Sequence, residues 1–105
     1  MNRYKVAITA PLFWDDQRSI DDILDIMADQ MRCFMNQASM TGFDEDRIVQ
    51  VILPVIADTS WHAADIAFTI WTMSLLNMEG VESDDSALDV RIEPAKRELF
   101  GLSAA

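Results

Sequence analysis

The sequence has few of the residues from which metal, redox and phosphate-binding sites are built. It contains one cysteine, Cys33, and one histidine, His62, so it cannot form an intramolecular disulfide or supply a zinc site from several Cys and His ligands. Its three glycines form neither a phosphate-binding loop nor a dinucleotide fingerprint. We therefore expect no metal, no cofactor and no enzymatic activity.

Positive charge is also scarce, with 8 Lys and Arg residues against 18 Asp and Glu residues and a formal net charge of −10. Phosphate backbones and anionic lipids repel such a chain, which argues against direct binding of nucleic acid or of a membrane. The longest strongly apolar stretch, residues 66–76, has about half the length needed to span a bilayer, and the N-terminus has no signal-peptide pattern. We expect a cytoplasmic protein.

The sequence is, however, rich in apolar residues (50%), and their regular patterns predict one folded domain over residues 1–105. Residues 3–10 alternate between apolar and polar side chains, as in a strand that Pro11 would end. Residues 88–92 alternate in the same way, and residues 95–105 can form a short helix.

Two longer stretches have the three-and-four spacing of apolar residues that is typical of helices. The first begins at Ser19, with Asp22 as its partner in a capping box, and is predicted to end at Gly42. The second begins at a cap among residues 58–60 and ends at Gly80. The second is so apolar around its circumference that we expect it to lie centrally in the fold.

Residues 48–56 fit two structures. Their β-branched side chains suit a buried strand. However, Asp44 can cap a helix just before them, and Gln50, Pro54 and Asp58 share one helical stripe, whereas strand alternation would leave both faces apolar. The pattern favours a helix, with a strand as the alternative.

These elements predict a small α+β domain in which the N- and C-terminal strands pair in one sheet and two to three helices pack on one face. Arg3 and Lys5 on the first strand complement Asp89 and Glu93 on the last, which suits neighbouring strands. If residues 48–56 form a strand, the fold becomes ferredoxin-like.

The single histidine offers one candidate for catalysis or metal binding. Asp58, His62 and Asp65 share one face of the second helix, where carboxylates could raise the basicity of the imidazole or share a metal. The alternative is that Asp58 stabilises the helix start while His62 and Asp65 form a solvated edge. We favour this alternative, because that face has too few ligands for zinc.

The acidic residues are the strongest indication of function. Six of them fall at predicted helix starts, where negative charge is stabilising, and need no further role. Residues 48–90, in contrast, contain seven acids and no Lys or Arg. Such one-sided charge is costly to a compact state unless it serves binding. The candidate partner-binding residues are Asp25, Asp29, Glu82, Asp84 and Asp85.

This charge predicts a non-catalytic acidic protein-binding module that engages a basic surface on another protein. In one version it is an inhibitor of the phage type, an antagonist of host defence whose carboxylates mimic nucleic-acid charge and block a basic nucleic-acid-binding complex.

The alternative is an accessory or regulatory subunit of a larger enzyme complex that docks through an apolar surface of Met and aromatic residues. Such residues are common at adaptable interfaces, and the candidates are Met35, Met40, Trp14 and Trp61. The same surface could serve a homodimer.

Overall fold

The structure, a computed structural model, describes residues 2–15, 17–32, 38–43 and 47–95. In chain order the elements are β1 (Asn2–Phe13), α1 (Ile20–Arg32), β2 (Ser39–Phe43), β3 (Ile48–Ala57), α2 (Ser60–Leu76), β4 (Glu82–Ser83), the 3-10 turn η1 (Asp85–Ala87) and β5 (Asp89–Pro94).

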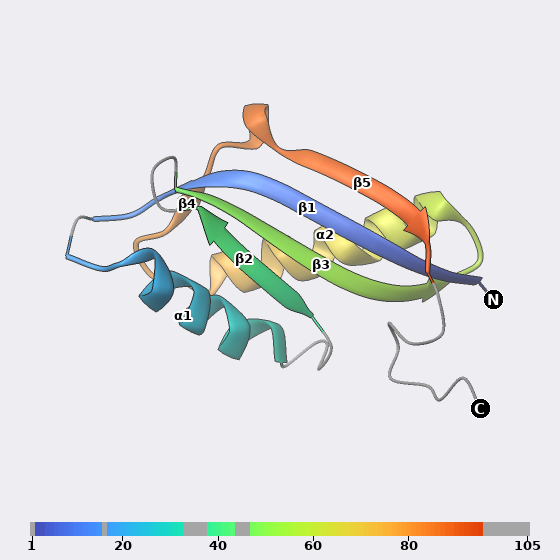
Figure 1. Cartoon of the computed structure of the whole chain (residues 1–105), viewed down its shortest axis with the longest axis horizontal. Coiled ribbons are helices and arrows are strands. Elements are labelled where there is room, and N and C mark those ends of the chain that lie inside the picture. Colours follow the sequence, from blue (N-terminus) through green and yellow to red (C-terminus); the bar gives the residue numbers. More distant parts are fainter. Residues whose placement is uncertain (1, 16, 33–37, 44–46, 96–105) are drawn as a thin grey trace.

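The strands form one antiparallel sheet in which β1 is central (Figure 1). On one side β1 pairs with β3, from Asn2 opposite Ala57 to Pro11 opposite Ile48, and β3 in turn pairs with the edge strand β2. On its other side β1 pairs with β5 and then, near its end, with the short strand β4. The pairing of the N- and C-terminal strands is therefore confirmed.

Both helices lie on the same face of this sheet (Figure 1), as the sequence predicts for an α+β fold. The side chains between the helices and the sheet form the core, because strand residues that point to this face are almost fully buried. The core includes Val6, Ile8, Leu12, Ile23, Met27, Met31, Val49, Val51, Leu53, Ile70 and Trp71.

Residues 48–56, which the pattern favours as a helix, form strand β3 instead. The helical interpretation was wrong because pairing with β1 and β2 satisfies the backbone and suits the β-branched side chains. The element order is β-α-β-β-α-β followed by a fifth strand, β5, so the first six elements follow the order of the ferredoxin-like alternative and β5 is an addition to it.

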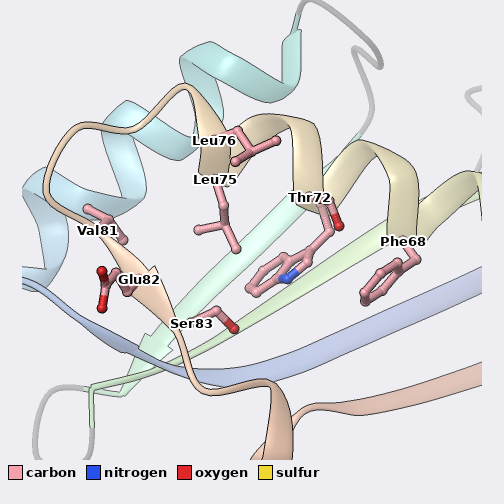
Figure 2. Close-up of a pocket in the computed structure, with 8 residues that line it drawn as sticks. Phe68, Thr72, Leu75, Leu76, Val81, Glu82 and Ser83 are labelled. Carbon is pink, nitrogen blue, oxygen red and sulfur yellow. The ribbon is translucent and has the colours of Figure 1, made fainter.

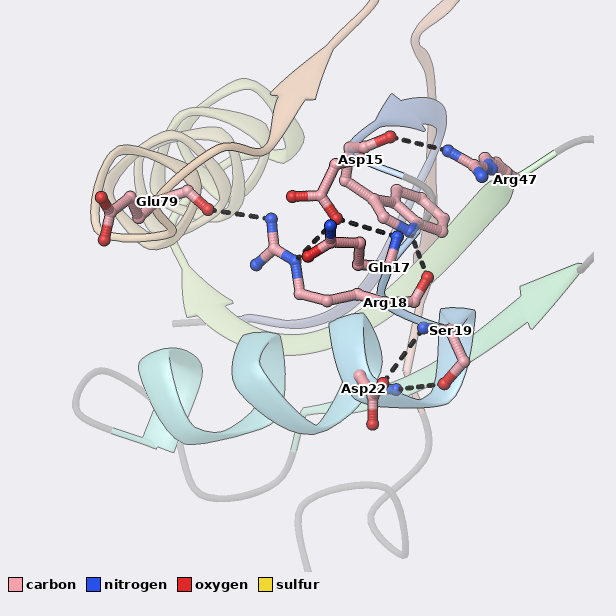
Figure 3. Close-up of polar contacts among 8 residues, drawn as sticks. Asp15, Gln17, Arg18, Ser19, Asp22, Arg47 and Glu79 are labelled. Atoms are coloured by element: carbon pink, nitrogen blue, oxygen red, sulfur yellow. Dashed lines mark hydrogen bonds and ion pairs between the residues drawn. The ribbon is translucent and has the colours of Figure 1, made fainter.

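The first helix is shorter than predicted. Its start is correct, since the Ser19 amide donates to Asp22 Oδ2 (3.0 Å) and the Asp22 amide donates to Ser19 Oγ (3.2 Å), a reciprocal capping box (Figure 3). The extension to Gly42 was wrong, because residues 39–43 form β2 and Gly42 lies against α1 rather than ending it.

Strand β1 continues through Pro11, where we predicted its end. Pairing with β5 covers residues 4–9 and pairing with β4 covers residues 12–13, so Pro11 lies where the neighbour of β1 changes and a missing amide breaks no ladder bond. Pro54 similarly lies beyond the last pair of β3 with β2, between Ser39 and Ile52.

The second helix, α2, begins as predicted but ends at Leu76, with Asn77 as its C-cap, four residues before the predicted end at Gly80. Thr59 is its cap, with Oγ1 accepting from the His62 amide at 3.1 Å, and Gly80 has a φ of 74° in the turn after the helix. The predicted helix start at residues 44–46 lies outside the described residues, as does nearly all of the predicted C-terminal helix, residues 96–105.

Candidate protein-binding surface

The outer side of α2 carries large apolar side chains that face solvent. Its inner side is covered by the sheet, and Ala67, Ile70 and Trp71 there are buried. Trp61 is nevertheless 85% exposed, Leu76 75% and Phe68 43%. Apart from a narrow polar edge that includes His62, Asp65 and Thr69, α2 is apolar, so the exposed stripe is the unusual feature of this element. We call Trp61, Phe68 and Leu76 the α2 stripe.

An open groove of about 440 Å³ runs beside this stripe, between α2 and strand β4 (Figure 2). Phe68, Leu75 and Leu76 point toward it from the helix, and Glu82 and Ser83 border it from β4 (Figure 2). Its full lining is Phe68, Trp71, Thr72, Leu75, Leu76, Val81, Glu82 and Ser83. Mostly apolar side chains therefore form a concavity with one carboxylate at its border, which is the form of a docking groove.

The charged residues around the α2 stripe are acidic. Asp65 lies exposed on the helix, Glu82 borders the groove, and Asp58 and Glu79 are exposed at the two ends of α2. Arg18 also reaches the Glu79 end, where its guanidinium donates to the Glu79 backbone oxygen at 3.2 Å (Figure 3). Residues 48–90 supply no cation, so Arg18 is the cation that we find beside these acids among the described residues.

The structure does not gather the five predicted partner-binding acids into one surface. Asp25 and Asp29 are exposed on α1, which packs against β2 at one edge of the sheet. Asp29 also forms an exposed ion pair with Arg32 at 3.0 Å. Glu82 belongs to β4, beyond β1 at the opposite edge.

The remaining two predicted acids follow β4. Asp84 uses Oδ1 to accept from both the amide (3.1 Å) and the hydroxyl (2.6 Å) of Ser86, and thereby stabilises the local turn. Asp85 begins η1. Of the five predicted acids, only Glu82 lines the groove beside the α2 stripe.

The structure gives no support to a catalytic or metal-binding role for Asp58, His62 and Asp65. All three residues are exposed at the start of α2, where the His62 amide donates to Thr59 and the Asp65 carbonyl accepts from Thr69 at 2.8 Å. Within the described ranges, no group of three or more His, Cys, Asp and Glu side chains is placed to hold a metal ion.

Of the predicted apolar contacts, Trp61 is exposed but Trp14 is not. Trp14 is 9% exposed, its Nε1 donates to the Arg18 carbonyl at 2.8 Å, and the Arg47 guanidinium lies 4.4 Å from its ring centroid. Trp14 thus fixes the connection between β1 and α1 and is not available to a partner. Met40 is half-buried on β2, and Met35 lies outside the described residues.

The sequence analysis missed Phe68 and Leu76. Both lie on the helical stripe of Trp61, so the helical period could have grouped them. We instead expected so apolar a helix to be central. That expectation was wrong for its outer side, which the described elements leave exposed.

The chain matches no model of a known protein family, and no curated protein is detectably similar to it. Among the described residues, neither α1 nor α2 combines the length and the apolar character needed to cross a lipid bilayer.

Proposed function

We propose that this protein is a non-catalytic protein-binding module that docks on its partner through the outer side of α2. The observation that carries this proposal is the exposed α2 stripe of Trp61, Phe68 and Leu76. Exposed apolar residues gathered on one face are a mark of interaction sites in soluble proteins.

The dimensions of the stripe suit a protein partner. Trp61 lies in the first turn of α2 and Leu76 in its last, so the stripe extends over about 22 Å of helix. Burying each of these side chains favours binding by about 1.5–3 kcal/mol. The groove beside Leu76 and Phe68 offers a concavity for an apolar side chain of the partner.

The surrounding acids determine what kind of partner fits. Asp65, Glu79 and Glu82 lie on or beside the apolar centre, so the complementary surface carries apolar residues among Lys and Arg residues. A basic nucleic-acid-binding protein has such a surface, and blocking it would make this chain an inhibitor. An accessory or regulatory subunit of a larger enzyme would dock in the same way.

The test is to capture the partner from the native host and to measure its affinity for variants of the α2 stripe. Trp61→Ala and Leu76→Ser should each weaken binding by roughly tenfold or more, since truncating an interface hot spot costs about 2 kcal/mol or more. Both side chains are exposed, so circular dichroism should show unchanged folding.

Asp25→Asn is the control, because it alters an exposed residue of the other helix, α1, outside the α2 stripe and its groove. It should leave the affinity unchanged. If the double variant Trp61→Ala/Leu76→Ser binds as tightly as the natural protein, the α2 stripe is not the docking surface and the proposal fails.

A further inference from the structure

The face of the sheet opposite the helices has an apolar strip of its own. The side chains of β3 that point to this face are Ile48, Gln50, Ile52, Pro54 and Ile56, of which only Gln50 is polar. Ile56 is 50% exposed, Ile48 and Ile52 are half-buried, and Pro54 is buried. Ala7 and Pro11 on β1 are the register partners of Ile52 and Ile48, and they widen the strip.

Strand β3 therefore has the composition of a strand that is covered on both faces. Antiparallel strands with one face in solvent normally alternate between apolar and polar residues, whereas continuous apolar runs occur where both faces are buried. The helices cover one face of β3, and no described helix covers the other (Figure 1). A further layer of protein would complete this arrangement.

This face also differs from the rest of the molecule in charge. Lys5 lies beside Glu93 across the β1–β5 pair, and Arg91 pairs with Asp89 at 2.9 Å. With Arg3, the outward positions of β1 and β5 hold three cations and two anions. In a chain with a net charge of −10, this apolar face is close to neutral.

We propose that a second copy of this chain packs against this face, sheet on sheet, and forms a two-fold symmetric dimer. Two copies that carry −10 each repel one another through their acidic surfaces. The near-neutral face avoids that repulsion. Across a two-fold axis the same patch of each copy contacts its counterpart on the other copy, which is the commonest arrangement in homo-oligomers.

The area of the face is at the lower limit for a specific dimer. From strand spacing and rise per residue, the paired lengths of β2, β3, β1 and β5 cover roughly 500 Å² per copy. The total of roughly 1,000 Å² reaches the lower limit for specific interfaces. In this dimer the two α2 stripes face outward on opposite sides, so dimerisation and partner binding use separate surfaces.

The first test is the mass of the full-length protein in solution, measured by light scattering or sedimentation equilibrium over a range of concentrations. The expected value is twice the chain mass of 11.9 kDa. Ile56→Lys should return the mass to that of one chain, because it places a charge at an exposed point of the apolar strip. Leu76→Lys on α2, the matched control, should leave the dimer intact.

A second measurement does not depend on altering the proposed interface. Replacing Cys33, the only cysteine, by serine and introducing Asp65→Cys allows one spin label per chain on the exposed side of α2. In the sheet-to-sheet dimer the two labels lie roughly 40 Å apart, since two sheets and two helices separate them.

Three results would overturn the proposal. They are a single-chain mass at every concentration, a folded Ile56→Lys variant that remains a dimer, and a label separation below roughly 20 Å, which would mean that α2 is the dimer contact. If Ile56→Lys fails to fold, the label separation decides the question.

Discussion

At the scale of one residue, Gly42 shows that a strand can require a glycine because of close packing rather than because of a turn. A Cβ atom built at this position of β2 would lie 2.7 Å from Ile20 Cδ1 and 3.0 Å from Leu24 Cδ1. The close approach of β2 to α1 therefore excludes a side chain, although the backbone there has no positive φ.

Gly42→Ala should lower the free energy of unfolding by about 1–3 kcal/mol, because the new methyl group overpacks the contact with Ile20. Urea denaturation measures this loss. Ile20→Ala removes both Ile20 atoms that clash with the new methyl group, Cδ1 at 2.7 Å and Cγ1 at 2.8 Å, so Gly42→Ala should cost less in that background. An equal cost in both backgrounds would show that the contact with Ile20 is not the cause.

Trp14 and Trp61 form a matched pair of tryptophans in opposite environments. Trp14 is 9% exposed and Trp61 is 85% exposed. Trp14→Ala should lower the free energy of unfolding by about 3–5 kcal/mol, through the lost ring and the lost hydrogen bond to the Arg18 carbonyl.

Trp61→Ala should change the free energy of unfolding by less than about 0.5 kcal/mol, because solvent already surrounds the side chain. Urea denaturation of both variants makes the comparison. Equal losses would contradict the assignment of Trp14 to the fold and of Trp61 to the docking surface.

At the scale of elements, α2 depends on a cap that the sequence predicts. Thr59→Ala should lower the free energy of unfolding by about 1 kcal/mol, because the His62 amide loses its acceptor at the helix start. Thr59→Ser keeps the hydroxyl group and should behave like the natural protein. Thermal or urea unfolding measures both, and a loss for Ser equal to that for Ala would rule out the cap as the cause.

Strand β3 is the element that the sequence pattern left open. Its apolar outward residues made strand alternation look inconsistent, and its β-branched content alone could not decide the matter. The deciding contacts are with β1, 37 to 55 positions earlier in the chain, and the local sequence pattern does not indicate them. The same outward residues that obscured the strand form the face that we assign to a second copy.

At the scale of the whole molecule, the net charge of −10 should make stability depend on salt. Raising NaCl from low concentration to about 0.15 M shortens the Debye length to about 8 Å and screens the repulsion among acids. The urea midpoint should therefore rise. Asp25→Asn/Glu82→Gln removes two exposed acids and should show a smaller rise. A midpoint that falls with salt would mean that ion pairs outweigh the repulsion.

Salt should also weaken binding of the captured partner, because exposed carboxylates attract its basic residues through a screened field. Part of the affinity should persist at high salt, since burial of the α2 stripe does not depend on charge. Titrations at two ionic strengths measure both parts. If the affinity does not change with salt, the acidic residues do not contribute to recognition of the partner. The proposed mimicry of nucleic-acid charge would then be wrong.

The sequence by itself determined the net charge, the N-terminal caps of both helices and the pairing of the terminal strands. It also narrowed the fold to two α+β arrangements. These features follow from composition and from patterns a few residues long, which local physics governs. Only the tertiary structure decided that residues 48–56 are a strand, that Trp14 is buried while Phe68 and Leu76 are exposed, and that Asp25 and Glu82 lie at opposite edges of the sheet. Each of these features depends on which distant segment of the chain covers a side chain. The pattern of neighbouring residues in the sequence does not specify that contact.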